Sequence, residues 1–198
     1  MTTAIKSSKT SNDSQNKLTS CIKNMSDSLK LKFWIKTLIC THGVIPEIIK
    51  TVDKMIELQA SNITFSSSVF NKKSTTYDQV ESVIDLSERK NKLLNIYIIG
   101  KKITENLTVD DHEFLERKYI YNWSAEEMAD YYACSIRTIY RKIDKLINSI
   151  CEYCATKNWS LKFIESQTKC EGWIKDQFIK TASEYFKNTN YKETQWQS

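Results

Sequence analysis

The sequence predicts an all-α fold, and three observations lead to that prediction. The chain of 198 residues contains only 3 Gly and 1 Pro, against about 7% and 5% in ordinary proteins. The tight turns of β-sandwiches and barrels depend on these two residues. Apolar residues instead recur at intervals of three and four, the period of an amphipathic helix. The glycines, at positions 43, 100 and 172, also lie too far apart for a phosphate-binding glycine loop.

The first 27 residues predict a flexible polar tail. They are rich in Ser, Thr, Lys and Asn and hold too few large apolar side chains to offset the entropy of ordering. Residues 1–15 lack the apolar stretch of a secretion signal. The densest apolar run, 93–99, is far shorter than the roughly 18 residues of a membrane span. We therefore expect a cytoplasmic protein that does not enter a membrane.

Residues 28–104 predict a helical region that packs within the chain or forms a dimer. Helices are expected over 29–41, from Pro46 onward and over 77–103, with a Ser- and Thr-rich loop at 61–76. The long helix carries a stripe with heptad spacing: Val80, Val83, Ile84, Ser87, Lys90 or Asn91, Leu94 and Ile98. One interpretation is packing inside the monomer. The other is a homodimeric coiled coil, which needs apolar positions through at least three heptads and is weakened here by polar residues 87–91.

Residues 105–156 contain three helix signals separated by short breaks. The segment 110–121 begins with acidic residues, which stabilise a helix N-terminus. Ser124 and Glu127 form a capping box for a second helix, and Ser135 caps a third after a break at 133–134. The third helix has a one-sided apolar face made of Ile139, Ile143, Leu146 and Ile150. Two short helices joined by such a tight turn predict a helix-turn-helix.

These residues also carry a family resemblance. Glu127-Met128-Ala129 followed by residues 133–141, with Phe114 to Tyr119 upstream, resembles the helix-turn-helix of sigma-70 region 4. The chain is similar in particular to the regulators of Gram-positive phages of the ArpU and RinA type. The resemblance implies DNA binding and implies RNA polymerase as a partner. Where that family often has Gly in the turn, this chain has Ala133, and a left-handed backbone would cost it about 1 kcal/mol.

The third helix supplies the candidate DNA contacts. If its apolar face points to the core, Arg137 and Arg141 point outward near its start, where each could bond guanine O6 and N7. Lys142 and Lys145 could neutralise phosphates, and Tyr140 could contact a phosphate or a thymine methyl group. The complete predicted contact set is Ser135, Ile136, Arg137, Thr138, Tyr140, Arg141, Lys142 and Lys145.

Charge is concentrated on the same helix. Residues 135–150 hold four basic side chains and one acidic one, a net +3, whereas residues 101–130 hold four basic and eight acidic, a net −4. A basic stripe on a helix can be merely solvated, but its coincidence with the helix-turn-helix favours contact with double-stranded DNA.

The rest of the chain offers no catalytic motif. The six cysteines include one close pair, Cys151 and Cys154, and the two histidines do not complete a zinc pattern with it. Free thiols, no cofactor and no enzymatic activity are therefore expected. Residues 157–198 predict a C-terminal helix and a frayed tail, in which Trp173 and Phe178 belong either to the core or to a partner surface.

The sequence therefore predicts a sequence-specific transcription regulator with a helical N-terminal region, a helix-turn-helix and a C-terminal helix. It would bind double-stranded DNA, with RNA polymerase as an implied partner. The alternative that the sequence leaves open is a helical module that docks on a protein instead of DNA.

Overall fold

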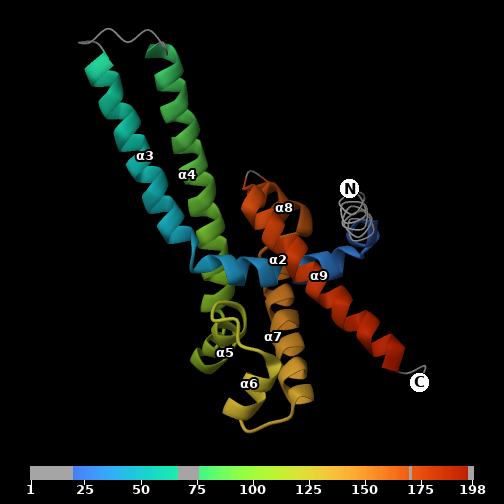
Figure 1. Cartoon of the computed structure of the whole chain (residues 1–198). Helices are drawn as coiled ribbons and strands as arrows, with labels where there is room; N and C mark the ends of the chain where they lie inside the picture. Colours follow the sequence, from blue (N-terminus) through green and yellow to red (C-terminus); the bar gives the residue numbers. More distant parts are fainter. Residues whose placement is uncertain (1–19, 67–75, 170, 196–198) are drawn as a thin grey trace, which may run out of the picture.

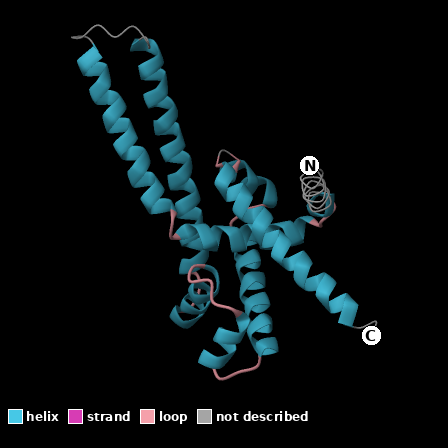
Figure 2. Cartoon of the chain, viewed as in Figure 1, coloured by secondary structure: helices cyan, strands magenta, loops and turns pink. Residues whose placement is uncertain are grey.

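The structure is a computed structural model that describes residues 20–66, 76–169 and 171–195. Every regular element in those ranges is a helix, which confirms the prediction of an all-α fold (Figure 2). None of the described helices combines the length and the apolar character needed to cross a membrane. The helices are α2 Asp27–His42, α3 Ile45–Ser66, α4 Thr76–Glu105, α5 Val109–Tyr119, α6 Ala125–Tyr131, α7 Ile136–Thr156, α8 Leu161–Thr168 and α9 Gly172–Gln195.

Helix α2 lies at the centre of the molecule and contacts α3, α4, α5, α7, α8 and α9 (Figure 1). It starts at Ser26, whose side chain accepts a hydrogen bond from the Leu29 amide. A helix that buries consecutive residues on all sides can only be covered by several neighbours at once. This arrangement holds for the segment 33–35 and for Leu38 and Ile39, all of which are buried. The core of the protein is therefore organised around α2.

Helices α3 and α4 form a long antiparallel hairpin that projects from the body (Figure 1). The 30 residues of α4 correspond to a length of about 45 Å. The half of α4 near the body supplies core residues such as Leu93, Ile96 and Ile103. Of the loop expected at 61–76, residues 67–75 lie outside the described part of the chain. Residues 61–66 instead continue α3, and Ser61 satisfies its hydroxyl within the helix by donating to the Glu57 carbonyl.

The C-terminal region contains two helices where one was expected. Helix α7 ends at Thr156 and is followed by Asn158, which has φ +57°, and Ser160 caps α8 by accepting from the Phe163 amide. Helix α9 then packs across α2 and extends to Gln195, through much of the segment expected to fray. Phe178 is buried and stacks on Trp34 with ring centroids 4.4 Å apart, so it belongs to the core.

The start of the described chain is also partly structured. Residues 20–23 are helical, and Ile22 and Met25 are half-buried against the core. Of the tail expected over 1–27, residues 1–19 lie outside the described ranges. The apolar side chains at 22 and 25 supply the burial that the polar composition of this segment did not suggest.

Candidate nucleic-acid interface

Helices α5, α6 and α7 form a three-helix unit at one end of the molecule, and α6 and α7 make its helix-turn-helix (Figure 1). The predicted capping box is present, with Ser124 and Glu127 each bonding the backbone of the other. Helix α6 ends in a Schellman turn, in which the Cys134 amide donates to the Ala129 carbonyl at 2.9 Å and the Ala133 amide donates to the Asp130 carbonyl at 3.3 Å.

Ala133 occupies the left-handed position of this turn, with φ +49°. The other two described non-glycine residues with positive φ are Asn122 and Asn158, and asparagine tolerates this region better than alanine does. The turn therefore has the backbone geometry that usually favours glycine, although Ala133 has a Cβ atom. The backbone at Ala133 is slightly strained, and the two hydrogen bonds of the turn maintain its shape.

Helix α7 begins at Ser135, which caps it. The Ser135 hydroxyl oxygen accepts from the Thr138 amide at 3.1 Å and lies 2.8 Å from the Thr138 hydroxyl. The first turn carries no acidic residue, so the positive end of the helix dipole is not neutralised there. Ser135 and Thr138, both predicted contacts, thus act together as the local cap of α7.

The two faces of α7 differ as predicted. Its inner face is buried and consists of Ile139, Ile143, Leu146, Ile147 and Ile150. Arg137, Arg141 and Lys145 are exposed and follow one another at intervals of four, so they form a single stripe along the outer face. Neither Arg137 nor Arg141 forms an ion pair with a described carboxylate. Ile136 and Tyr140, with 40% and 45% of their surface exposed, flank this stripe.

Lys142 lies apart from the other predicted contacts. Its ammonium is 3.0 Å from the Asp111 carboxylate of α5 and 4.6 Å from the centre of the Phe114 ring. Burial opposes ionisation of Asp111, but hydrogen bonds from Lys142 and Thr108 prevail, and the pKa of that carboxyl is lowered. Lys142 therefore joins α7 to α5, and we remove it from the set of candidate phosphate contacts. The sequence could not indicate this, because its partner lies 31 positions away.

Helix α6 presents the opposite charge. Glu126, Glu127 and Asp130 are exposed on it. The backbone hydrogen bond from Ser124, with that from its side chain, lowers the pKa of the Glu127 carboxyl, so it stays ionised. The basic stripe of α7 thus lies beside an acidic helix. The positively charged surface of the helix-turn-helix is therefore confined to α7.

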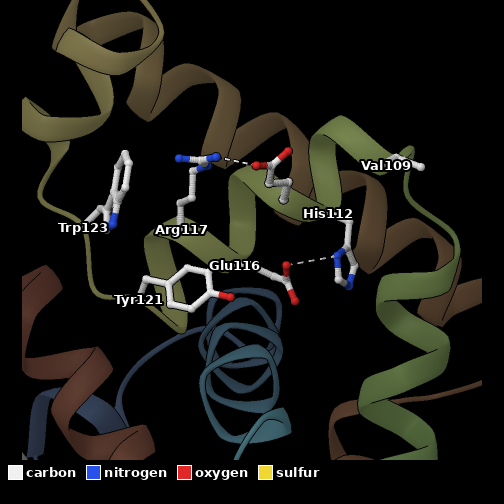
Figure 3. Close-up of a pocket in the computed structure, with 7 residues that line it drawn as sticks. Val109, His112, Glu116, Arg117, Tyr121 and Trp123 are labelled. Atoms are coloured by element: carbon white, nitrogen blue, oxygen red, sulfur yellow. Dashed lines mark hydrogen bonds and ion pairs between the residues drawn. The ribbon is translucent and has the colours of Figure 1, made fainter.

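A cavity of about 620 Å³ lies on α5 and the loop after it, and none of the eight predicted contacts lines it. Figure 3 shows Arg117, His112 and Glu116 projecting from α5 and Tyr121 and Trp123 from the loop. His112 is 3.6 Å from Glu116. The lining therefore combines aromatic rings with polar side chains that already contact one another, Arg117 with Glu113 and His112 with Glu116.

Arg117 holds this corner of the unit together. It pairs with Glu113, and its guanidinium lies 4.8 Å from the ring centre of Trp123 and 4.0 Å from that of Tyr131. Its contacts with both the loop and α6 are cation–π interactions. Arg117 carried no predicted role, although the spacing of Glu113 and Arg117 by four residues signalled their ion pair.

Of the five cysteines that the structure describes, Cys154 is buried, Cys40, Cys134 and Cys151 are half-buried, and Cys21 is exposed. Burial raises the pKa of the Cys154 thiol to about 12 and that of Cys40 to about 11, so both remain protonated. Within the described ranges, no group of three or more His, Cys, Asp and Glu side chains is arranged to hold a metal ion. Cys151 and Cys154 both belong to α7. Cys154 lies on its inner face and is fully buried.

The chain matches no known protein-family model, and no curated protein or solved structure is significantly similar to it. The assignment of a function therefore depends on the residues and geometry of the chain itself.

Proposed function

We propose that the protein is a sequence-specific DNA-binding transcription regulator that inserts α7 into the major groove. The observation that carries the proposal is the basic stripe of α7, in which Arg137, Arg141 and Lys145 are exposed along the first half of a capped helix. The first residues of a recognition helix are those that reach base edges. Because Arg137 and Arg141 form no ion pair with the carboxylates that the structure describes, their donors are available for guanine O6 and N7.

The roles within this proposal differ along the helix. Arg137 and Arg141 would read bases, Lys145 would contact a phosphate, and Ile136 and Tyr140 would meet thymine methyl groups or the sugar-phosphate backbone. Ser135 and Thr138 would present the α7 N-terminus to a phosphate. Such a regulator would act in the cytoplasm, and the resemblance to sigma-70 region 4 favours RNA polymerase as its protein partner.

The experiment is a selection from a random duplex library with the full chain, followed by anisotropy titrations of the enriched site at several salt concentrations. Affinity should fall steeply with salt as counterions are released. Arg137→Ala and Arg141→Ala should each weaken binding to the selected site about tenfold to a hundredfold and reduce selectivity. A control of equal charge is Lys162→Ala with Lys169→Ala on and after α8, which should bind normally. No enrichment, or an equal loss of affinity when the two arginines are replaced together and when the two control lysines are replaced, would contradict the proposal.

A second candidate function rests on the charge of α6. Its exposed Glu126, Glu127 and Asp130 would face the phosphate backbone if α6 crossed it, and they suit a basic protein surface better. In that case the helix-turn-helix would dock on a protein such as a polymerase subunit. The selection from random duplexes separates the two candidates, because this one predicts a complex with purified bacterial RNA polymerase in size-exclusion chromatography without any enrichment of a DNA site.

A further inference from the structure

Helix α4 has two apolar faces, and only one of them is used inside the chain. The inner face includes Leu93, Ile96 and Ile103, which are fully buried. The second face, here called the outer stripe, has heptad spacing and consists of Val80, Ile84, Ser87, Asn91, Leu94 and Ile98. Val80, Ile84 and Ile98 are 43%, 53% and 47% exposed, although all three are aliphatic. An apolar stripe of this period is the surface through which helices pair.

The order of residues in the outer stripe matches a second copy of itself run in the opposite direction. About a two-fold axis at residue 89, Val80 of one copy faces Ile98 of the other, and Ile84 faces Leu94. Ser87 then faces Asn91, so the two polar layers meet at the centre and the aliphatic layers flank them. A two-fold interface requires this kind of self-complementarity, and a central polar layer is the usual device for fixing register.

Charge along α4 favours the same orientation. Residues 76–88 contain four acidic side chains and no basic one, whereas residues 89–102 contain five basic side chains and no acidic one. Arg89 and Lys90 pair with Glu171 and Asp53 outside α4. Lys92 and Lys101 lie 3.7 and 3.5 Å from Glu88 and Glu105 of α4 itself and are exposed on the helix surface. Antiparallel pairing sets the acidic half of each copy against the basic half of the other, and parallel pairing sets like charges together. The helix dipole does not account for this division, because its effect is confined to the first and last turns.

We propose that the protein forms a homodimer in which the outer stripes of two α4 helices pack antiparallel. The projecting hairpin of Figure 1 is then the dimerisation arm, and the three-helix unit of each copy stays outside the interface. Dimerisation through α4 takes place in the absence of DNA, so its test does not depend on the proposed DNA binding.

Sedimentation equilibrium of the full chain tests the dimer. We expect twice the chain mass of 23.2 kDa, and we expect Ile84→Glu with Ile98→Glu to return it to the monomer mass with unchanged helix content. The matched control is Leu58→Glu with Val109→Glu, two aliphatic residues that are 65% and 83% exposed outside the stripe. The control should remain dimeric. A monomeric parent chain, or dissociation of both variants alike, would overturn the proposal.

Disulfide trapping tests the orientation. The double variant Val80→Cys, Ile98→Cys should give a covalent dimer under mild oxidation, and each single variant should give no more than the parent chain with its native cysteines. Efficient linkage of either single variant to itself would mean parallel pairing and would overturn the antiparallel arrangement. Both readouts are made without DNA.

Discussion

Glu171 and Arg89 join two parts of the molecule that are 82 positions apart in the sequence. The Glu171 carboxylate accepts from Arg89 Nε at 2.8 Å and from Arg89 Nη2 at 3.0 Å, and it also accepts from Trp173 Nε1 at 2.8 Å. The Glu171 side chain is 2% exposed and that of Arg89 is 43% exposed. The bidentate pair therefore fastens α4, and with it the projecting hairpin, to the corner between α8 and α9.

This pair should respond asymmetrically to mutation. Arg89→Ala leaves a buried carboxylate with one donor and should lower the free energy of unfolding by about 3 kcal/mol. Glu171→Gln leaves a guanidinium that reaches water and should cost about 1 kcal/mol. Urea unfolding measures both values, and Lys92→Ala, which removes an exposed pair with Glu88, should change stability by less than about 0.5 kcal/mol. If Arg89→Ala and Glu171→Gln lowered the free energy of unfolding equally, the burial of the Glu171 carboxylate would not be the cause of the effect.

Ala133→Gly should stabilise the protein. A left-handed backbone costs a residue with a Cβ atom about 1–2 kcal/mol, and glycine loses about 0.4–1 kcal/mol through its freer unfolded chain. The net gain expected is about 0.5–1 kcal/mol in the free energy of unfolding, measured by urea titration. As a control, Ala155→Gly in the right-handed backbone of α7 should destabilise by a similar amount. A loss of stability for Ala133→Gly would contradict the strained turn.

Replacing Lys142 should lower stability, whereas replacing Lys145 should weaken DNA binding. Lys142→Ala removes a partly screened ion pair and a cation–π contact and should cost about 1 kcal/mol of stability. Lys145→Ala should leave stability unchanged and reduce the salt dependence of DNA binding by about one phosphate contact. Because the pKa of Asp111 is lowered in the folded state, its ion pair with Lys142 should stabilise the fold fully above about pH 4. This part of the Lys142 contribution should be lost as the pH falls further, through the lowered pKa of the folded state. A loss of stability for Lys145→Ala, with a change in DNA binding alone for Lys142→Ala, would contradict the pairing of Lys142 with Asp111.

Acidification should weaken the fold through His42. This ring stacks on that of Tyr97 with centroids 4.8 Å apart, and its buried Nδ1 has no hydrogen-bond partner among the described residues. Burial, and then the nearby charges of His112 and Lys101, lower its pKa against the opposing effect of Glu116. The unfolded chain therefore binds a proton more readily, and stability should fall as the pH drops below about 6.5.

The pH dependence of His42 can be isolated by comparing variants. His42→Phe keeps a ring on Tyr97 but cannot titrate, so its free energy of unfolding should change less between pH 7.5 and pH 5 than that of the parent chain. His112→Asn should show an intermediate change, because it removes one charge that depresses the pKa of His42. Identical pH profiles for the parent and His42→Phe would exclude His42 as the source.

Much of the three-helix unit could be predicted because its signals are local. The capping box of Ser124 and Glu127, the cap at Ser135 and the apolar spacing after it act within a few residues, and the helices begin where these signals stand. The break between α8 and α9 was missed, although Gly172, the first residue of α9, belongs to a type that weakens a helix interior. The high density of apolar residues over 159–179 favoured a single helix.

The sequence by itself determined that the chain is helical, where the helices of 105–156 begin, and which face of α7 is buried. It could do so because propensity, caps and periodicity depend on neighbouring residues. Only the tertiary structure decided which charged and apolar side chains are paired or buried inside the chain and which remain at the surface. It turned Lys142 toward Asp111, joined Arg89 to Glu171 and left three aliphatic side chains of the outer stripe of α4 exposed, those of Val80, Ile84 and Ile98. Those outcomes depend on partners far away in the chain, and long-range packing selects such partners without leaving a periodic signal.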